Sequence, residues 1–294
     1  MTGVEPLSAP LCAGPDPNPR PPRFAVPDGA VDCHAHICGP VKRYPFAKDR
    51  IYTPPDALLS DYLQVLRTLG VTRGVLVQPS GYGFDNSCLV DALAEAGPNF
   101  RGIAVVDPQC SDEDLDQLHA VGVRGLRFNV LFGGGAKIEL VPAMARRIQR
   151  LGWHVQLLID VSRFQGLYDL VQSIPVPVVV DHMGHVPVDV GVTDHGFQTL
   201  LALLAKRRCW VKLSGSYRMT RLSKNPYADV NEFAQALVRV APNQCLWASD
   251  WPHPQIPVLL PNDGNLMDQL ADWIPVEHLR KQVLVENPTR LYGF

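Results

Sequence analysis

The stretch VDCHAHICGP, residues 31–40, decides between the two α/β folds that the sequence allows. It begins as a short apolar strand, and two histidines, His34 and His36, lie near the end of that strand. A doubly wound open sheet would usually carry a Gly-rich phosphate turn after its first strand, and HAHICGP is not such a turn. The stretch therefore favours a barrel over an open sheet.

Beyond this stretch, a short apolar run followed by a segment with helical spacing recurs along the chain. The predicted strands are residues 31–37, 74–79, 102–107, 123–129, 153–160, 177–182, 209–215 and 245–250. The predicted helices are residues 57–69, 86–96, 111–120, 141–151, 163–173, 196–206, 229–240 and 264–272. Near-continuous apolar strands that alternate with helices indicate a parallel sheet covered on both faces. Eight such units predict a single-domain, TIM-like (β/α)₈ barrel.

The N-terminal segment differs from the rest of the chain in composition. Residues 1–28 hold eight of the 27 prolines and show no apolar periodicity, so we expect an irregular, disordered arm there. The predicted barrel domain spans residues 29–294.

Composition excludes several classes of protein. A net charge of −2 with no basic run argues against nucleic acid as a partner. No apolar run approaches the roughly 20 residues of a membrane-spanning helix, and the N-terminus does not resemble a signal peptide, so we expect a soluble, cytoplasmic protein with no membrane partner. Seven scattered cysteines fit a reducing compartment.

Polar residues recur where the predicted strands end, which is where barrel enzymes build their sites. They are His34, His36, Gln78, Ser80, Asp107, Arg127, Asn129, Gln156, Asp160, Asp181, His182, Lys212, Ser214 and Asp250. The histidines and the aspartate that end the first, sixth and eighth strands point most clearly to chemistry.

Two histidines separated by one residue lie on the same face of a strand. Converging imidazoles can bind a metal, or they can donate hydrogen bonds to a developing oxyanion. Cys33 alternates away from His34 and His36, and no second cysteine pair exists at zinc-knuckle spacing. We therefore expect Cys33 and Cys38 to be structural.

The sixth and eighth strands supply the partners of the histidine pair. His182 ends the apolar run of VVVDHMGHVP, whereas Asp181 has the opposite parity and is expected to face the helices. Asp250 in LWASDWPHP is costly to bury unless it is paired or reactive, and it is a natural general base for water. Arg127 and Arg218 suit a carboxylate substrate, which guanidinium groups hold bidentately.

Taken together, several segments make the chain resemble the lactonase branch of the amidohydrolase superfamily, typified by 2-pyrone-4,6-dicarboxylate lactonases. They are GAVDCHAHICGP, RGIAVVDP, GVRGLRFN, IPVPVVVDHMG, DWPHP and ENPTRLYGF. The resemblance implies a hydrolase that opens a small carboxylated lactone. It implies that His34, His36 and His182 polarise the lactone carbonyl while Asp250 activates water, and that the substrate is contacted by Tyr52, Ser80, Arg127 and Arg218.

Two positions depart from the dicarboxylate lactonases. Those enzymes resemble this chain up to RFN but then carry a basic pair, where residues 130–135 read VLFGGG, and they have a tyrosine where this chain has Leu158. Both positions serve substrate carboxylates in the family. We therefore expect a lactone with fewer or differently placed carboxylates. Sugar-acid lactonases or lactone isomerases, sulfomuconolactone hydrolases and zinc-dependent decarboxylases or hydrolases of the same superfamily remain alternatives.

The resemblance also bears on cofactors. Metal-using members of the superfamily add a bridging Lys or Glu on the fourth strand or a histidine on the fifth, where this chain has Arg127, Asn129, Gln156 and Leu158. We expect no required cofactor. One zinc ion held by His34, His36 and Asp250 is the alternative.

Overall fold

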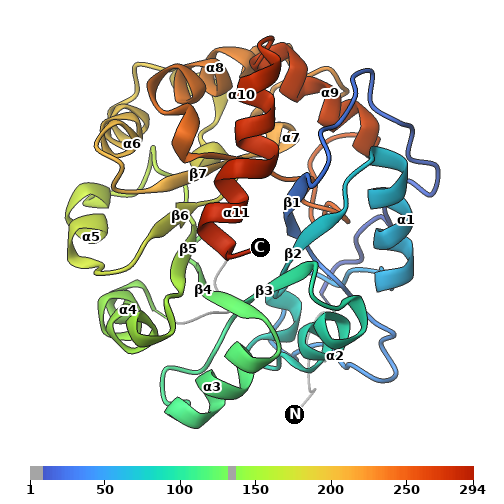
Figure 1. Ribbon diagram of the computed structural model, residues 1–294, viewed down its shortest axis with the longest axis vertical. Helices are drawn as coiled ribbons and strands as arrows, with labels where there is room; N and C mark the ends of the chain where they lie inside the picture. Colours follow the sequence, from blue (N-terminus) through green and yellow to red (C-terminus); the bar gives the residue numbers. More distant parts are fainter. Residues whose placement is uncertain (1–8, 132–136) are drawn as a thin grey trace, which may run out of the picture.

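Eight short apolar strands pair in chain order as one parallel sheet in the computed structural model, which describes residues 9–131 and 137–294. The strands are β1 (Val31–Ala35), β2 (Arg73–Val77), β3 (Phe100–Ala104), β4 (Val123–Asn129), β5 (His154–Leu158), β6 (Val178–Val180), β7 (Trp210–Leu213) and β8 (Cys245–Trp247). All eight predicted strands are present, and Figure 1 shows them surrounded by helices. The predicted TIM-like (β/α)₈ barrel is confirmed.

The first and last strands close the barrel at the point where the candidate site lies. The backbone amide of Asp250 donates to the carbonyl of His34 at 2.9 Å, and the amide of His36 donates to the carbonyl of Trp251 at 2.7 Å. Ala35 and Trp251 form a parallel bridge beside these bonds. Closure therefore brings the histidine pair next to Asp250.

The predicted helices cover the outside of the barrel. They are α1 (Leu59–Leu69), α2 (Ser87–Ala96), α3 (Asp112–Ala120), α4 (Val141–Ile148), α5 (Leu167–Ser173), α6 (His195–Ala205), α8 (Asn231–Val240) and α9 (Asp263–Trp273). Each presents apolar residues to the strands, as Tyr62, Leu66 and Leu69 do in α1. In the described parts of the chain, three short α-helices were not predicted: α7 (Ser216–Met219), α10 (Glu277–Lys281) and α11 (Asn287–Tyr292).

Helix α11 crosses one end of the barrel, as Figure 1 shows, and closes it. Tyr292 packs in the inner apolar cluster with Val31 at the start of β1, and its ring lies 5.3 Å from that of His154 at the start of β5. The end of the barrel where the strands begin is thus filled. The opposite end, where the strands finish, is left for a site.

A register shift in β1 overturns one expectation about side-chain direction. Asp32 pairs with Gly74 and Ala35 with Leu76, so two residues of β1 oppose a single residue of β2. Because of this bulge, Cys33 and His34 both face the barrel interior: Cys33 packs in the inner apolar cluster, and His34 contacts Lys212. The expectation that Cys33 alternates away from the histidines is wrong. Its thiol is nevertheless buried and free.

The N-terminal arm is irregular over residues 9–28 but is bound to the barrel. Asn262, at the start of α9, donates to the carboxylate of Asp16 and to the carbonyl of Asn18, and Arg20 donates to Asn265. The arm is therefore packed against α9, and the expectation of disorder is wrong for these residues.

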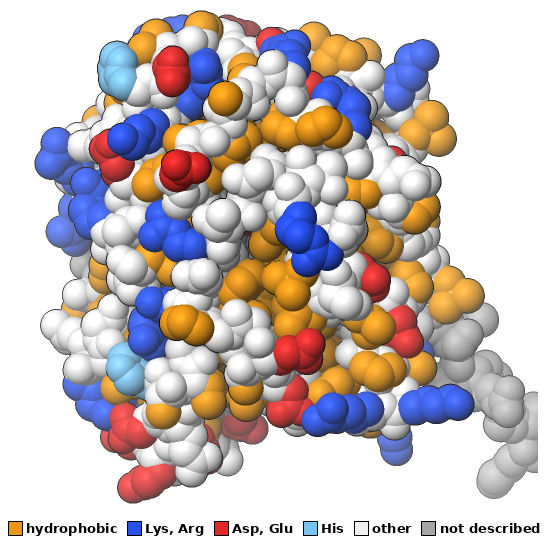
Figure 2. Space-filling view, turned by 45° about the vertical axis from the view of Figure 1, so that its right-hand side comes forward, with side chains coloured by type: hydrophobic (Ala, Val, Ile, Leu, Met, Phe, Trp, Pro, Cys, Tyr) orange, Lys and Arg blue, Asp and Glu red, His pale blue; other side chains and the backbone are white. Residues whose placement is uncertain are grey.

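The helices of the described chain include none that is long and apolar enough to cross a membrane. On the face drawn in Figure 2, Lys and Arg side chains are scattered among acidic, apolar and uncharged ones.

Candidate active site

A pocket of about 330 Å³ opens at the end of the barrel where the strands finish. Its walls come from the strand ends and the loops that follow them. The lining residues are His36, Tyr52, Ser80, Arg127, Leu158, His182, Arg218, Asp250, Pro254 and Gln255. Seven of the eight predicted site residues are in this set. The eighth, His34, is fully buried and contacts the ring of His36.

Asp250 occupies the centre of the site, and its two carboxylate oxygens have different surroundings. Oδ2 accepts hydrogen bonds from the hydroxyl of Tyr217 at 2.6 Å and from Nε of Arg218 at 2.9 Å. Oδ1 is buried and has no hydrogen-bond partner within the described parts of the chain. One oxygen is thus fixed, and the other is available to a ligand.

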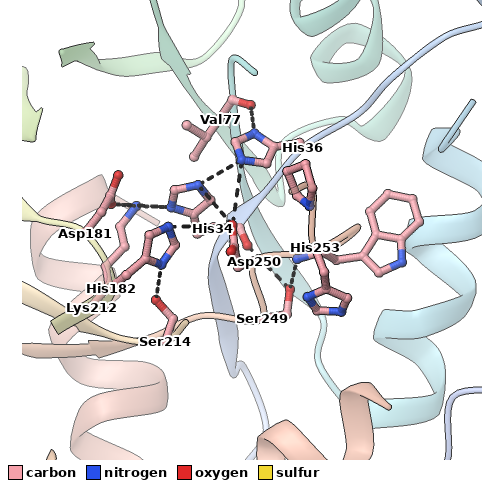
Figure 3. A network of polar contacts seen from close by, with 12 residues as sticks. His34, His36, Val77, Asp181, His182, Lys212, Ser214, Ser249, Asp250 and His253 are labelled. Carbon is pink, nitrogen blue, oxygen red and sulfur yellow. Dashed lines mark hydrogen bonds and ion pairs between the residues drawn. The ribbon is translucent and has the colours of Figure 1, made fainter. Parts of the chain in front are cut away.

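Three imidazole rings face the available oxygen. The Nε2 atoms of His34, His36 and His182 each lie 3.7 Å from Oδ1 of Asp250, and Figure 3 shows the rings gathered around the carboxylate. These distances are too long for direct hydrogen bonds. A small molecule that bonds to both the carboxylate and the rings fits this arrangement.

The buried Lys212 fixes the hydrogen-bonding state of His34. Its ammonium donates to Oε1 of Gln156 at 2.7 Å and to Nδ1 of His34 at 3.1 Å, and it forms an ion pair with Oδ1 of Asp181 at 3.2 Å. Because an ammonium only donates, Nδ1 of His34 accepts. A neutral ring then carries its proton on Nε2, pointing into the site.

His36 has the opposite polarity. Its Nδ1 lies 2.7 Å from the carbonyl oxygen of Val77, which only accepts, so the proton is on Nδ1. The lone pair on Nε2 then accepts from Nε2 of His34 at 3.2 Å. Lys212, His34, His36 and Val77 thus form one directed chain of hydrogen bonds, visible in Figure 3. In this arrangement Nε2 of His36 has no proton to donate to a substrate carbonyl, which differs from the role that the resemblance implies.

Burial keeps all three rings neutral. It lowers the pKa of His36 to about 4 and that of His182 to about 3. The pKa of His34 is lowered well below its usual value by burial and by the charge of Lys212. Near neutral pH these rings therefore act as hydrogen-bonding groups without charge.

Neighbouring side chains keep the carboxylate of Asp250 ionised. Burial alone would raise its pKa, but the guanidinium of Arg218, 2.8 Å away, and the surrounding imidazoles hold it well below the usual range. The carboxylate is therefore ionised near neutral pH, at the cost of a lower basicity.

Asp181 lies inside the barrel, and the expectation that it faces the helices is wrong. β6 ends at Val180, and Asp181 follows the inward parity of Val179. Its carboxylate contacts Lys212 and lies 3.4 Å from Nε of Arg127. Burial would raise its pKa, but Lys212 and the other neighbours lower it well below the usual range. Asp181 is therefore an internal counterion for two cations.

His182 enters the site through a strained turn. Its φ is +49°, and Nδ1 lies 2.9 Å from the hydroxyl of Ser214. A Cβ added to Gly215 would lie 2.9 Å from Cβ of His182, so this close approach requires glycine. Asp250 also has a positive φ, of +64°. Backbone strain at these two residues is typical of functional sites.

The predicted substrate contacts surround the same pocket. Ser80 accepts a hydrogen bond from the side-chain amide of Asn129, and Tyr52 lines the pocket with it. Arg127 is buried apart from its edge on the pocket. Leu158 supplies an apolar wall. The Gly-rich segment that replaces the family's basic pair lies largely outside the described residues, which omit 132–136.

The site contains side chains of the types that bind metal ions, namely histidines and aspartates. His34, His36 and Asp250 place ligand atoms within 4.8 Å of one another, as do His34, Asp181 and His182. A metal needs an imidazole lone pair, however, whereas the bond from Lys212 leaves a proton on Nε2 of His34. Arg127 and Arg218 add positive charge beside the ligand atoms. In this hydrogen-bonded arrangement, the proton on Nε2 of His34 would have to leave before that nitrogen could bind a metal.

Several residues that complete the site were not predicted for it. Lys212 and Gln156 were noted only as polar residues at strand ends, although the alternation of apolar and polar residues in WVKL places Lys212 inside. Tyr217 and Asp263 have no local signal, because each meets its partner only in the folded chain.

The chain is similar to several known proteins. A family model described as amidohydrolase matches residues 31–294. A 4-sulfomuconolactone hydrolase of Rhizobium radiobacter is 38% identical over 298 residues, covering 100% of this chain and 99% of the relative. A 2-pyrone-4,6-dicarboxylate hydrolase of Comamonas testosteroni is 39% identical over 286 residues, covering 94% of this chain and 93% of the relative. An apo crystal structure of an Agrobacterium tumefaciens protein has a TM-score of 0.85 and 29% identity, covering 93% of this chain and 98% of that one.

Proposed function

The chain belongs to the amidohydrolase family, and from this premise we propose that it hydrolyses a small carboxylated lactone. The observation that carries the proposal is the placement of Asp250, whose available Oδ1 faces three neutral imidazoles at 3.7 Å. The similarity to two kinds of lactone hydrolase supports the choice of a lactone. Hydrolysis assays at neutral pH across mono- and dicarboxylic lactones and matched amides test it. Turnover of the amides alone would contradict it.

An acidic substrate is favoured by the charge of the site. Among the described residues, Arg127, Arg218 and Lys212 are cationic and only Asp181 and Asp250 balance them. With neutral histidines the site carries an excess positive charge, which an anionic ligand neutralises. Guanidinium groups on the pocket wall bind a carboxylate or another planar or tetrahedral acid group through paired hydrogen bonds.

In the proposed reaction, a water molecule bonded to Oδ1 of Asp250 attacks the lactone carbonyl. The water gives one proton to Oδ1 as its oxygen bonds to the carbonyl carbon. The tetrahedral intermediate then breaks the ring C–O bond, and the leaving oxygen takes the proton from Asp250. The net change is addition of one water to give a ring-opened acid, and the carboxylate of Asp250 is regenerated.

Charge that develops on the carbonyl oxygen meets donors in a buried site. Nε2–H of His34 bonds to Nε2 of His36 in the free site and can be shared with the oxyanion, since Lys212 holds the other nitrogen of His34. His182 offers Nε2–H when the hydroxyl of Ser214 donates to Nδ1. His36 serves as the acceptor that orients His34. Because the low pKa makes Asp250 a weak base, we expect this stabilisation of the oxyanion to supply much of the rate.

We further propose that turnover requires no metal. The support is the directed chain from Lys212 to Val77, which occupies the nitrogen atoms that a metal would need. Protein stripped with a chelator and shown to be metal-free by elemental analysis is expected to keep its full rate. Stoichiometric zinc whose removal abolishes turnover, with recovery on adding zinc back, would contradict this.

Recognition of the substrate acid can be tested at Arg127. Arg127→Met is expected to raise KM for an acidic lactone by about 10- to 100-fold, since a hydrogen bond to a charged group contributes roughly 1.5–3 kcal/mol. The preference for the acid over its neutral methyl ester should fall in parallel. Arg124→Met is the matched control, because Arg124 is on the same strand but bonds to the carbonyl of His119 outside the pocket. If Arg127→Met keeps the normal preference for the acid over its methyl ester, residues other than Arg127 recognise the acid group.

A further inference from the structure

A buried file of four polar side chains leads away from the pocket, starting at Asp250. The hydroxyl of Tyr217 lies 2.6 Å from Oδ2 of Asp250 and 3.0 Å from Nδ1 of His253. Nε2 of His253 lies 3.1 Å from Oδ1 of Asp263. All four side chains are almost completely buried. They come from α7, from the loop after β8 and from the first residue of α9, so the contacts depend on the complete fold.

The directions of these hydrogen bonds follow from the first one. A 2.6 Å contact between a hydroxyl and an ionised carboxylate is a charge-assisted hydrogen bond, so the proton of Tyr217 points to Asp250. The oxygen of Tyr217 then accepts from Nδ1–H of His253. The carboxylate of Asp263 accepts from Nε2–H on the other side of the ring, so the two bonds together place a proton on each ring nitrogen and fix the orientation of His253. Each member of the file thus orients the next, ending at Oδ2 of Asp250.

Fixing Oδ2 determines where Oδ1 points. The terminal torsion of an aspartate is broad, so an unrestrained carboxylate rotates easily. Arg218 also bonds to Oδ2, but its guanidinium lines the pocket and is a proposed partner of the substrate acid. Tyr217 does not line the pocket and is buried behind Asp250. Its hydroxyl can therefore hold the carboxylate while Arg218 engages a substrate.

We propose that Tyr217 is a positioning residue that aims Oδ1 of Asp250 at the reacting water, and that His253 and Asp263 orient its hydroxyl for this task. The inference rests on the proposed function, because it acts through Asp250. It assigns roles to three residues outside the pocket.

The test compares Tyr217→Phe in the normal chain and in the Asp250→Asn chain. In the normal chain we expect kcat to fall by about 10- to 100-fold with KM nearly unchanged, as expected for a lost hydrogen bond to a charged group. In the Asp250→Asn chain, single-turnover rates at high enzyme concentration should be the same with and without the tyrosine hydroxyl. Tyr227→Phe is the matched control, because Tyr227 is equally buried and its hydroxyl has no hydrogen-bond partner among the described residues.

Equal fold losses from Tyr217→Phe in both backgrounds would overturn the inference, since the hydroxyl would then act independently of Asp250. A normal kcat in Tyr217→Phe would overturn it as well. Near-normal turnover by Asp250→Asn alone would instead refute the proposed role of Asp250, so the two failures are distinguishable.

The role of His253, in the outer part of the file, is tested by comparing two substitutions of this residue. His253→Asn keeps an amide donor near the position of Nδ1, whereas His253→Ala removes it. We expect the Asn variant to retain more of kcat than the Ala variant at similar KM and similar thermal stability. Equal losses of kcat in the two variants would contradict the orienting role of His253.

Discussion

Asp250→Asn is expected to lower kcat by on the order of a thousandfold, because the amide accepts no proton from water and general base catalysis typically contributes 10²–10⁴-fold. Asn is nearly isosteric with Asp, and its amide oxygen can still accept from Tyr217 and Arg218. KM for an acidic lactone should therefore change much less than kcat. Steady-state rates with the best substrate of the lactone panel measure both quantities.

Asp107→Asn is the matched control for this substitution. Asp107 also follows a strand, but among the described residues its carboxylate accepts only from the backbone amide of Gln109, and it does not line the pocket. Its variant should keep the normal rate. Circular dichroism and thermal unfolding of both variants check that the barrel is intact. A near-normal kcat in Asp250→Asn, with the fold preserved, would refute the assignment of Asp250 as the base.

Lys212→Met is expected to change both stability and metal binding. Removing one partner of a buried ion pair leaves Asp181 with less compensation, and such a change typically costs about 3–5 kcal/mol of unfolding free energy. The double variant Lys212→Met/Asp181→Asn removes both charges and should be less destabilised than Lys212→Met alone. Urea unfolding of the single and double variants measures this coupling. Additive losses would mean that the pair does not interact as the distance of 3.2 Å implies.

The same substitution should permit zinc binding. Without the ammonium, Nδ1–H of His34 can donate to Asp181, which lies 3.4 Å away, and Nε2 then presents a lone pair. Together with His36 and Asp250 this completes a set of zinc ligands. Zinc stoichiometry by elemental analysis should rise in Lys212→Met but not in Asp181→Asn, which retains Lys212. Equal zinc content in the original chain and in Lys212→Met would contradict the role of Lys212.

The barrel could be predicted from the sequence because each strand is short, apolar and followed by a helical segment. The same pattern placed Asp250, His182 and the histidine pair at one end of the barrel. Side-chain direction was predicted less well, since a strict alternation does not hold where the backbone departs from regular geometry. The bulge at Cys33 and the early end of β6 before Asp181 are such departures.

The groups that support Asp250 could not be predicted, for a different reason. Tyr217 belongs to a helix of four residues, and Asp263 begins a helix on the outside of the barrel. Neither has a spacing that links it to Asp250, and their contacts depend on how separate loops fold together. Lys212 was visible as a charged residue in an apolar strand, but its effect on His34 depends on distances that only the structure supplies.

The most direct test of the central claim is a single turnover in oxygen-18 water, with enzyme in excess over an acidic lactone. Direct attack by water activated at Asp250 predicts that the ring-opened product carries one labelled oxygen in its new carboxylate, as detected by mass spectrometry. A product without label after the first turnover would contradict the account, because the oxygen would then come from the protein or from the substrate itself, as in a lactone isomerase.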